Sequence, residues 1–203
     1  MKAVRVNEFG GPEALSVEDI EVPVAAEGEA LIKVEAAGIN FIDTYQRSGL
    51  YQIPLPSTLG LEAAGTVEAV GPGAKHFKVG DRVAYTNVAG AYADYAAVPE
   101  DKLVSLPEGV SYAQGAAAML QGCTAHYLCQ STYQVKAGDR CLVHAAAGGV
   151  GLLLIQMIKM LGGTVIGTCS TEAKAELARQ AGADEVILYS EQDFEEEAKR
   201  LTN

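Results

Sequence analysis

The stretch that decides the fold is Val143-His144-Ala145-Ala146-Ala147-Gly148-Gly149-Val150-Gly151. The apolar segment from Cys141 to His144 has the length of a short buried strand, and a nearly all-apolar helical pattern runs from Gly149 to Leu161. A strand, a glycine-rich turn and a helix in this order are typical of a nucleotide-binding α/β unit.

The glycines of this turn fit the dinucleotide-binding fingerprint. On that alignment Gly148 lets the backbone approach a pyrophosphate and Gly151 lets the helix pack closely on the strand, while Ala146 replaces the first glycine. The N-terminal amides of the helix would attract the anion. We therefore expect a pyrophosphate to bind along the turn, with a purely structural turn as the alternative. The expected binding residues are Ala147, Gly148, Gly149, Val150 and Gly151.

Two further strand-and-helix pairs are expected downstream. They are a strand over Thr164 to Thr168, a helix over about Thr171 to Ala181, a strand over Glu185 to Leu188 and a last helix capped by Ser190 with Asp193. This alternation predicts parallel strands with right-handed crossovers. It supplies only the first of the two βαβαβ halves of a Rossmann domain. The first strand would then be an exposed apolar edge, prone to aggregation or to pairing with another chain.

Before residue 120 the pattern is short and strand-like, with turn residues at close intervals. Strands are expected over Met1 to Val6, Leu15 to Val22, Ala30 to Ile39, Glu62 to Val70, Arg82 to Tyr85 and Tyr92 to Val98. Helices are expected over Phe41 to Arg47, Tyr112 to Leu120 and Thr124 to Gln130. This organisation predicts a small, mostly antiparallel β-barrel domain.

Composition restricts the class of protein and its partners. Of 203 residues, 49% are hydrophobic and 20% are charged, which is a globular composition. The net charge of −11 argues against binding to nucleic acid or to an anionic membrane. No signal sequence and no membrane-spanning segment is evident, so a cytoplasmic protein is expected. The four cysteines form no C-x-x-C pair, and we expect each to be a buried, reduced thiol.

The residues after the second expected strand indicate which nicotinamide cofactor binds. An acidic side chain about 20 residues beyond the glycines would bind a free ribose 2′-hydroxyl. This chain has Cys169-Ser170-Thr171 there, with Lys174 one helical turn later, and hydroxyls with an ammonium suit a 2′-phosphate. Glu172 is the counter-argument, because it is either a ribose ligand or a first-turn residue favoured by the helix dipole. The sequence favours NADPH over NADH.

Four co-linear motifs carry a family resemblance: Ala37-Gly38-Ile39-Asn40-Phe41-Ile42-Asp43, Gly60-Leu61-Glu62-Ala63-Ala64-Gly65, Val79-Gly80-Asp81-Arg82-Val83, and His144 to Gly151. The chain resembles about the N-terminal three-fifths of a zinc-free quinone oxidoreductase of the zeta-crystallin-like branch of the medium-chain dehydrogenase/reductase superfamily. The resemblance implies an α/β architecture, with a GroES-like β-barrel substrate domain over residues 1–122 and the first half of an NADPH-binding Rossmann domain over 123–203. It also implies a C-terminally truncated chain that lacks the family's homodimer contact at the Rossmann edge.

The zinc-dependent members of the superfamily differ at the metal ligands. Asn40 stands where they have a cysteine, Leu61 stands where they have a histidine, and their third ligand falls near Leu120 or Gln121. Without thiolate and imidazole ligands a catalytic zinc cannot be held, so no metal site is expected. Alcohol oxidation, which needs that Lewis acid, is disfavoured.

The resemblance implies hydride transfer from NADPH to a quinone or, as the alternative, to the β-carbon of an enone or alkenal. Neither acceptor needs a metal when hydrogen bonds stabilise the developing oxyanion. The residues implied are Asn40, Tyr45 and Tyr51 at the substrate, Thr124 at the nicotinamide, and Ser170, Lys174 and Tyr189 at the 2′-phosphate. Asn40 has a second interpretation as a helix cap, and the tyrosines as ordinary half-buried side chains. A non-catalytic NADPH-binding remnant is the third possibility.

Overall fold

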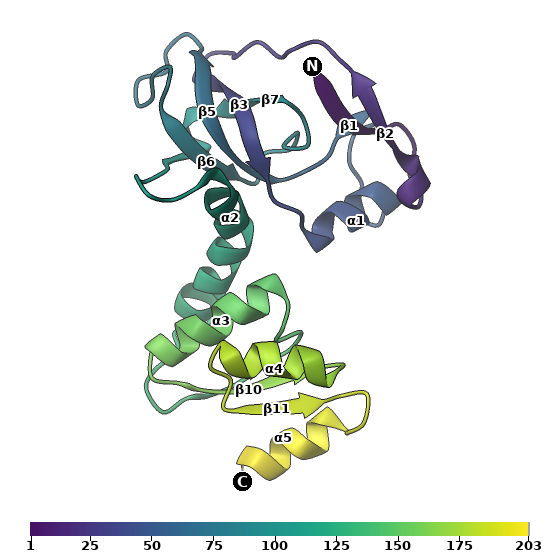
Figure 1. Cartoon of the computed structure of the whole chain (residues 1–203), viewed down its shortest axis with the longest axis vertical. Coiled ribbons are helices and arrows are strands. Elements are labelled where there is room, and N and C mark those ends of the chain that lie inside the picture. Colours follow the sequence, from purple (N-terminus) through teal and green to yellow (C-terminus); the bar gives the residue numbers. More distant parts are fainter. Residues whose placement is uncertain (203) are drawn as a thin grey trace. The chain divides into compact units, whose positions relative to one another are not determined.

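The chain forms two compact units, Met1–Leu120 and Gln121–Asn203. The computed structural model describes residues 1–202. The division falls inside helix α2 (Tyr112–Tyr127), which is labelled in Figure 1.

The first unit contains two antiparallel sheets, with strand orders β7-β3-β5-β6-β8 and β2-β1-β4 (Figure 1). The strands are β1 Lys2–Val6, β2 Leu15–Asp19, β3 Glu29–Ala37, β4 Ser57–Thr58, β5 Glu62–Val70, β6 Arg82–Thr86, β7 Tyr95–Pro99 and β8 Leu103–Ser105. Helix α1 covers Phe41–Ser48, and short 3-10 turns cover Pro12–Ala14 and Glu100–Lys102. The core lies on the larger sheet, where Ile32, Val67 and Tyr85 are fully buried or nearly so. The predicted antiparallel barrel-type domain is confirmed.

Two expectations in the first half need correction. Strands β4 and β8 were not predicted, because two and three residues are too few to show an alternating pattern. The two helices expected on either side of Gly122 are one helix, α2, which continues as a π-helical turn over Leu128–Thr132. Gly122 does not end the helix, since an isolated helical glycine costs only about 1 kcal/mol.

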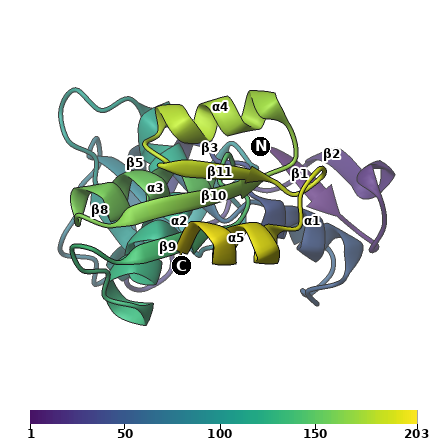
Figure 2. The ribbon, with the colours of Figure 1, turned by 90° about the horizontal axis from the view of Figure 1, so that it is seen from below.

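The second unit is a parallel sheet with the strand order β11-β10-β9. Its elements are β9 Arg140–Val143, α3 Gly149–Met160, β10 Thr164–Cys169, α4 Glu172–Gln180, β11 Glu185–Leu188 and α5 Phe194–Thr202. Figure 2 shows α4 and α5 on opposite sides of β10 and β11. Ile155, Ile158 and Val165 are central members of the core between α3 and the sheet. The predicted first half of a Rossmann domain is confirmed.

Strand β9 is an edge strand within residues 1–202, since the ladder there joins it to β10 alone. Leu142 on this strand keeps 40% of its surface exposed. The position and partly apolar character of the edge agree with the sequence, while its tendency to pair with another chain stays a prediction.

The expectation that every cysteine is buried was wrong for Cys123. Cys129 and Cys169 are buried, Cys141 is partly buried and Cys123 is exposed, and all four are free thiols. Ala125 and Cys129, four positions apart, lie on the buried side of their helical segment. Cys123 lies two positions before Ala125, which turns it by about 200° to the opposite side.

The cap of the last helix is Asp193 rather than Ser190. Asp193 Oδ1 accepts hydrogen bonds from the main-chain N–H groups of Glu195 (2.9 Å) and Glu196 (3.0 Å). The Ser190 hydroxyl instead donates to the carbonyl of Ser170 at 2.8 Å, which joins the ends of β10 and β11. No helix within residues 1–202 has the length and apolar character to span a membrane.

Candidate functional site

The glycine-rich turn joins β9 to α3 and is anchored to the neighbouring strand. The N–H of Ala146 donates to the carbonyl of Thr168 on β10 at 3.0 Å, and Ala146 is fully buried. Gly167, opposite on β10, makes room for it, because a Cβ there would lie 2.8 Å from the Ala146 Cβ. Alanine at this fingerprint position is therefore a core residue matched by a glycine on the next strand.

Ala145 gives the turn its sharp bend. Its φ of +49° lies in the left-handed region, which is uncommon for a residue with a side chain. The bend is closed by the N–H of Gly148, which donates to the carbonyl of Ala145 at 2.8 Å. Gly148 is the N-cap of α3, and its position leaves that helix end without a side-chain cap among the described residues.

The glycines leave open the space that a pyrophosphate would need. Gly148 and Gly149 are exposed and carry no side chain of their own over the start of α3, and Ala147 and Val150 are partly buried beside them. Gly151 is buried, and a Cβ on it would lie 2.6 Å from the carbonyl oxygen of Ala146. Exposed glycines at an uncapped helix N-terminus fit a dinucleotide phosphate.

Gln121 on α2 lies against this turn, and sequence reasoning did not assign it to the cofactor site. A methyl group on Gly149 would overlap the side-chain amide of Gln121, so this amide lies directly against the first residue of α3. The dinucleotide fingerprint does not require a glycine at position 149. This extra glycine was therefore the sign in the sequence that another side chain lies against the turn. Thr124, the predicted nicotinamide contact, is partly buried on α2 three residues after Gln121.

Of the three residues predicted for the 2′-phosphate, Ser170 and Tyr189 follow neighbouring strands and Lys174 lies in the first turn of α4. Cys169 pairs with Leu188 in the parallel ladder, so Ser170 and Tyr189 follow at the same edge of the sheet. Lys174 Nζ donates to Ser170 Oγ at 3.3 Å. Tyr189 keeps 52% of its surface exposed. A hydroxyl, an ammonium and an exposed phenol at one edge are donors that suit a phosphate.

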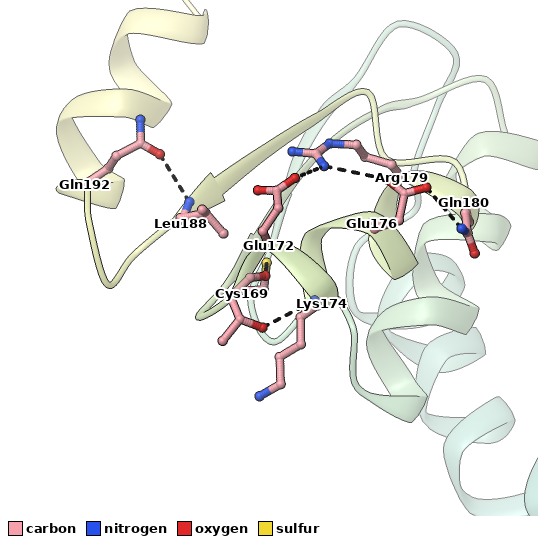
Figure 3. A network of polar contacts seen from close by, with 9 residues as sticks. Cys169, Glu172, Lys174, Glu176, Arg179, Gln180, Leu188 and Gln192 are labelled. Carbon is pink, nitrogen blue, oxygen red and sulfur yellow. Dashed lines mark hydrogen bonds and ion pairs between the residues drawn. The ribbon is translucent and has the colours of Figure 1, made fainter.

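Glu172, whose acidic side chain argued against NADPH as the cofactor, forms an ion pair with Arg179 on the same helix. Arg179 Nη1 donates to Glu172 Oε1 at 2.5 Å and lies 3.8 Å from Glu176 Oε2. Figure 3 shows the Lys174 side chain extending away from the Glu172–Arg179 pair. Thr171 caps the helix by accepting a hydrogen bond from the N–H of Lys174. The geometry therefore favours the interpretation of Glu172 as a first-turn residue over that of a ribose ligand.

Asn40 lies at the start of α1 and is 7% exposed. Its main-chain N–H donates to Asp43 Oδ2 at 2.8 Å, so Asp43 closes the helix end. Its side-chain Nδ2 donates to Glu62 Oε1 at 2.7 Å. Asn40 is thus the N-cap residue and forms a capping box with Asp43, while its side-chain Nδ2 is held by Glu62 on β5.

Tyr45 on α1 and Tyr51, three residues after the end of that helix, lie together. Their ring centroids are 5.3 Å apart with the rings tilted by 54°, and the N–H of Tyr51 donates to the carbonyl of Tyr45 at 3.0 Å. Phe41 adds an edge contact to Tyr45 at 5.4 Å. Tyr51 is 52% exposed, which leaves ring surface for an aromatic ligand.

A cavity of about 540 Å³ adjoins α1 within the first unit, and its lining includes Asn40, Asp43 and Tyr92. Tyr45 and Tyr51 do not line it, so the three predicted substrate residues do not share this cavity. The Tyr92 hydroxyl donates to Asp43 Oδ2 at 2.5 Å. Burial raises the pKa of Tyr92, and the hydrogen bond to Asp43 raises that pKa further.

Two of the positions where the resemblance would place zinc ligands carry Leu61 and Asn40. Leu61 is buried and apolar, and the Asn40 amide donates to a carboxylate. Residues 1–202 contain no cluster of three His, Cys, Asp or Glu side chains that could hold a metal ion.

Comparison with known proteins places the chain among dehydrogenases and reductases. Residues 26–108 match the family described as alcohol dehydrogenase GroES-like domain, and residues 149–203 match the family described as zinc-binding dehydrogenase. A quinone oxidoreductase of Pseudomonas aeruginosa is 48% identical over 204 residues, which cover 100% of this chain and 63% of that protein. A 2-haloacrylate reductase of Burkholderia is 41% identical over 98% of this chain and 62% of its own length.

The solved structures include an Escherichia coli quinone oxidoreductase complexed with NADPH. It superposes with a TM-score of 0.97 at 46% identity, over 100% of this chain and 63% of that one. The chain therefore spans less than two thirds of the length of these relatives. Both halves of the chain and their order match throughout, and the chain belongs to the quinone oxidoreductase family of the medium-chain dehydrogenase/reductase superfamily.

Proposed function

We propose that the protein reduces a quinone with NADPH, without a catalytic metal. The observation that carries the cofactor assignment is the Lys174–Ser170 contact at the end of β10, with Glu172 engaged by Arg179. An ammonium close to a hydroxyl suits a phosphate dianion, and a carboxylate already paired with a guanidinium is a poor ribose ligand. The NADPH complex of the E. coli relative supports the same assignment.

The second unit binds the cofactor in this proposal. The first amides of α3 receive the pyrophosphate at Ala147, Gly148, Gly149, Val150 and Gly151, and the 2′-phosphate meets Ser170, Lys174 and Tyr189. Thr124 contacts the nicotinamide. NADPH, when bound, supplies the hydride.

The first unit orients the acceptor. Asn40 donates an N–H to the quinone oxygen that gains negative charge, and the exposed ring of Tyr51, with Tyr45 packed against it, stacks on the quinone plane. The quinone takes up a hydride and a solvent proton, giving a hydroquinone. Leu61 and Asn40 replace the imidazole and thiolate that a zinc would need, so this chemistry proceeds by hydrogen bonding alone.

Reduction of an activated alkene is the second candidate, and the 2-haloacrylate reductase among the relatives favours it. The same Asn40 donor would stabilise the enolate oxygen formed when hydride reaches the β-carbon. Comparing 1,4-benzoquinone with 2-chloroacrylate as acceptors, each with NADPH, separates the two candidates by their kcat/KM.

We also propose that residues 1–122 act as the substrate domain and residues 123–203 as half of the cofactor domain. A cytoplasmic location is proposed too, supported by four cysteines that remain free thiols.

The test of the cofactor site is Lys174→Ala, with NADPH and NADH titrated separately by fluorescence. A charge-assisted contact to phosphate is worth about 1.5–3 kcal/mol, so the Kd for NADPH should rise about 10- to 150-fold. The Kd for NADH should stay within about twofold. Lys199→Ala on α5 removes an equal charge that pairs with Glu195 on its own helix, and it should change neither value.

Equal losses of both cofactors in Lys174→Ala would overturn the 2′-phosphate assignment. NADPH binding without reduction of either acceptor would instead support the non-catalytic remnant and defeat the proposed activity.

A further inference from the structure

Glu62 is a fully buried carboxylate at the start of β5 that the proposed chemistry does not use. Both of its oxygens accept hydrogen bonds. Oε1 accepts from Asn40 Nδ2 at 2.7 Å, and Oε2 accepts from the main-chain N–H of Leu120 at 2.5 Å. An ionised carboxylate is costly to bury, and it is retained only where such contacts compensate the loss of hydration.

The surrounding backbone is shaped around this carboxylate. The N–H of Gly38 donates to the carbonyl of Glu62 at 3.1 Å. A Cβ on Gly38 would overlap the Glu62 carboxylate itself. Gly38 therefore provides the space through which Glu62 reaches Asn40, two residues further along the chain.

The chemistry of Glu62 decides how the Asn40 amide is turned. An ionised carboxylate only accepts hydrogen bonds, so it must face the NH₂ group of Asn40 rather than its carbonyl. With one N–H held by Glu62, the NH₂ group is fixed on the Glu62 side of the amide and the carbonyl on the other side. A glutamine at position 62 would lose this constraint, because it carries both a donor and an acceptor.

We propose that Glu62 is a positioning residue that fixes the Asn40 amide in the orientation needed to donate to the substrate oxygen. The proposal rests on the proposed role of Asn40 in reduction. The hydrogen bond from the main-chain N–H of Leu120 on α2 holds the Glu62 carboxylate in place, and so it also helps to fix the Asn40 amide.

The first readout is independent of turnover. In ¹⁵N-labelled protein the Asn40 side-chain NH₂ pair, identified by its loss in Asn40→Asp, should shift and lose its distinct position in Glu62→Gln. Gly38→Ala should move the same pair, because its methyl group displaces the carboxylate without changing its charge. An Asn40 pair that stays in place in both variants would overturn the proposal.

The second readout is kinetic. Loss of one oriented donor to a developing oxyanion costs about 10²- to 10³-fold in kcat, and misorientation of a donor that is still present should cost about 10- to 100-fold. Glu62→Gln and Gly38→Ala should therefore lower kcat for 1,4-benzoquinone while leaving the Kd for NADPH within about twofold. In an Asn40→Ala background, Glu62→Gln should have little further effect on kcat.

The matched control is Glu100→Gln. Glu100 is also buried, at 9% exposure, and accepts hydrogen bonds from the main-chain N–H groups of Lys75, His76 and Phe77. It should lower stability without changing kcat. Equal kcat losses in Glu100→Gln and Glu62→Gln would reduce Glu62 to a structural role. An inactive wild type would refute the proposed function, while the NMR comparison would still decide whether Glu62 orients Asn40.

Discussion

Replacing Gly151 by alanine tests how closely helix α3 must approach the phosphate turn. A Cβ at this position would lie 2.6 Å from the carbonyl oxygen of Ala146 and 2.8 Å from its carbonyl carbon, and closer still to the carbonyl oxygen of Ala145. Ordinary contact begins at 3.4 Å, so the shortfall from Ala146 alone is 0.8 Å. These are main-chain atoms that cannot rotate aside, and the helix end must move from the turn.

Overpacking of this kind costs about 1–3 kcal/mol, so the free energy of unfolding of Gly151→Ala should fall by about that amount. A displacement approaching 1 Å at the phosphate amides should raise the Kd for NADPH about tenfold or more. Urea denaturation measures the first effect without cofactor, and fluorescence titration measures the second.

Gly122→Ala is the matched control, because it is the same substitution inside a helix, and within residues 1–202 the new methyl group would have no atom within 4 Å apart from its chain neighbours and the nearby backbone of its own helix. It should raise stability by about 0.5–1 kcal/mol. If Gly151→Ala unfolds at the wild-type urea midpoint and binds NADPH as tightly, the close approach of α3 to the turn is not the reason for this glycine.

Two further substitutions test charged contacts of the second unit. Arg179→Ala removes the partner of Glu172 and leaves an unpaired carboxylate beside the proposed 2′-phosphate site, so NADPH should bind about three- to tenfold more weakly and NADH no worse. Titration of both cofactors measures this. An unchanged ratio of the two Kd values would contradict the role given to Arg179. Burial raises the pKa of Asp184, but hydrogen bonds from Lys159 Nζ and the N–H of Val165 outweigh it, so this pKa lies below its usual value. The stabilisation from ionised Asp184 is therefore present above the unfolded-state pKa of about 3.9 and is lost as the pH falls through the lower folded-state value. Asp184→Asn should be less stable than wild type at neutral pH, and urea midpoints of the two proteins should converge below about pH 4; a constant difference would contradict this.

The sequence predicted the second unit well because its signals are local. The glycines from Gly148 to Gly151 mark the junction of β9 with α3, and the bounds of β11 agree with the expected strand to the residue. Ser170 and Lys174 were identifiable for the same reason, since they stand close behind the second strand of the unit, where the ribose of a dinucleotide is recognised. Tyr189 was implied by the family resemblance alone, and the ladder of β10 with β11 places it at the same edge of the sheet as Ser170.

The arrangement around Asn40 could not be read in the same way. Its amide partner is Glu62, which is 22 residues away, and the second partner of that carboxylate is Leu120, a further 58 residues on. Neither separation corresponds to a helical or strand period, so only tertiary folding brings these groups together. The pairing of Glu172 with Arg179 is intermediate, because seven residues correspond to two helical turns, but the sequence gives no preference between this partner and a ribose.

The left-handed Ala145 places stability and ligand binding in competition. Glycine adopts this backbone conformation without steric cost, but it also raises the conformational entropy of the unfolded chain. A search for more stable variants would favour glycine at position 145 where the relief of strain exceeds this entropic cost. Such a turn would also be free to leave the bent conformation that presents the first amides of α3. Selection for thermal stability alone would thus replace Ala145 by glycine and make the phosphate-binding turn more flexible. Selection for cofactor affinity would keep Ala145, although its backbone conformation is strained.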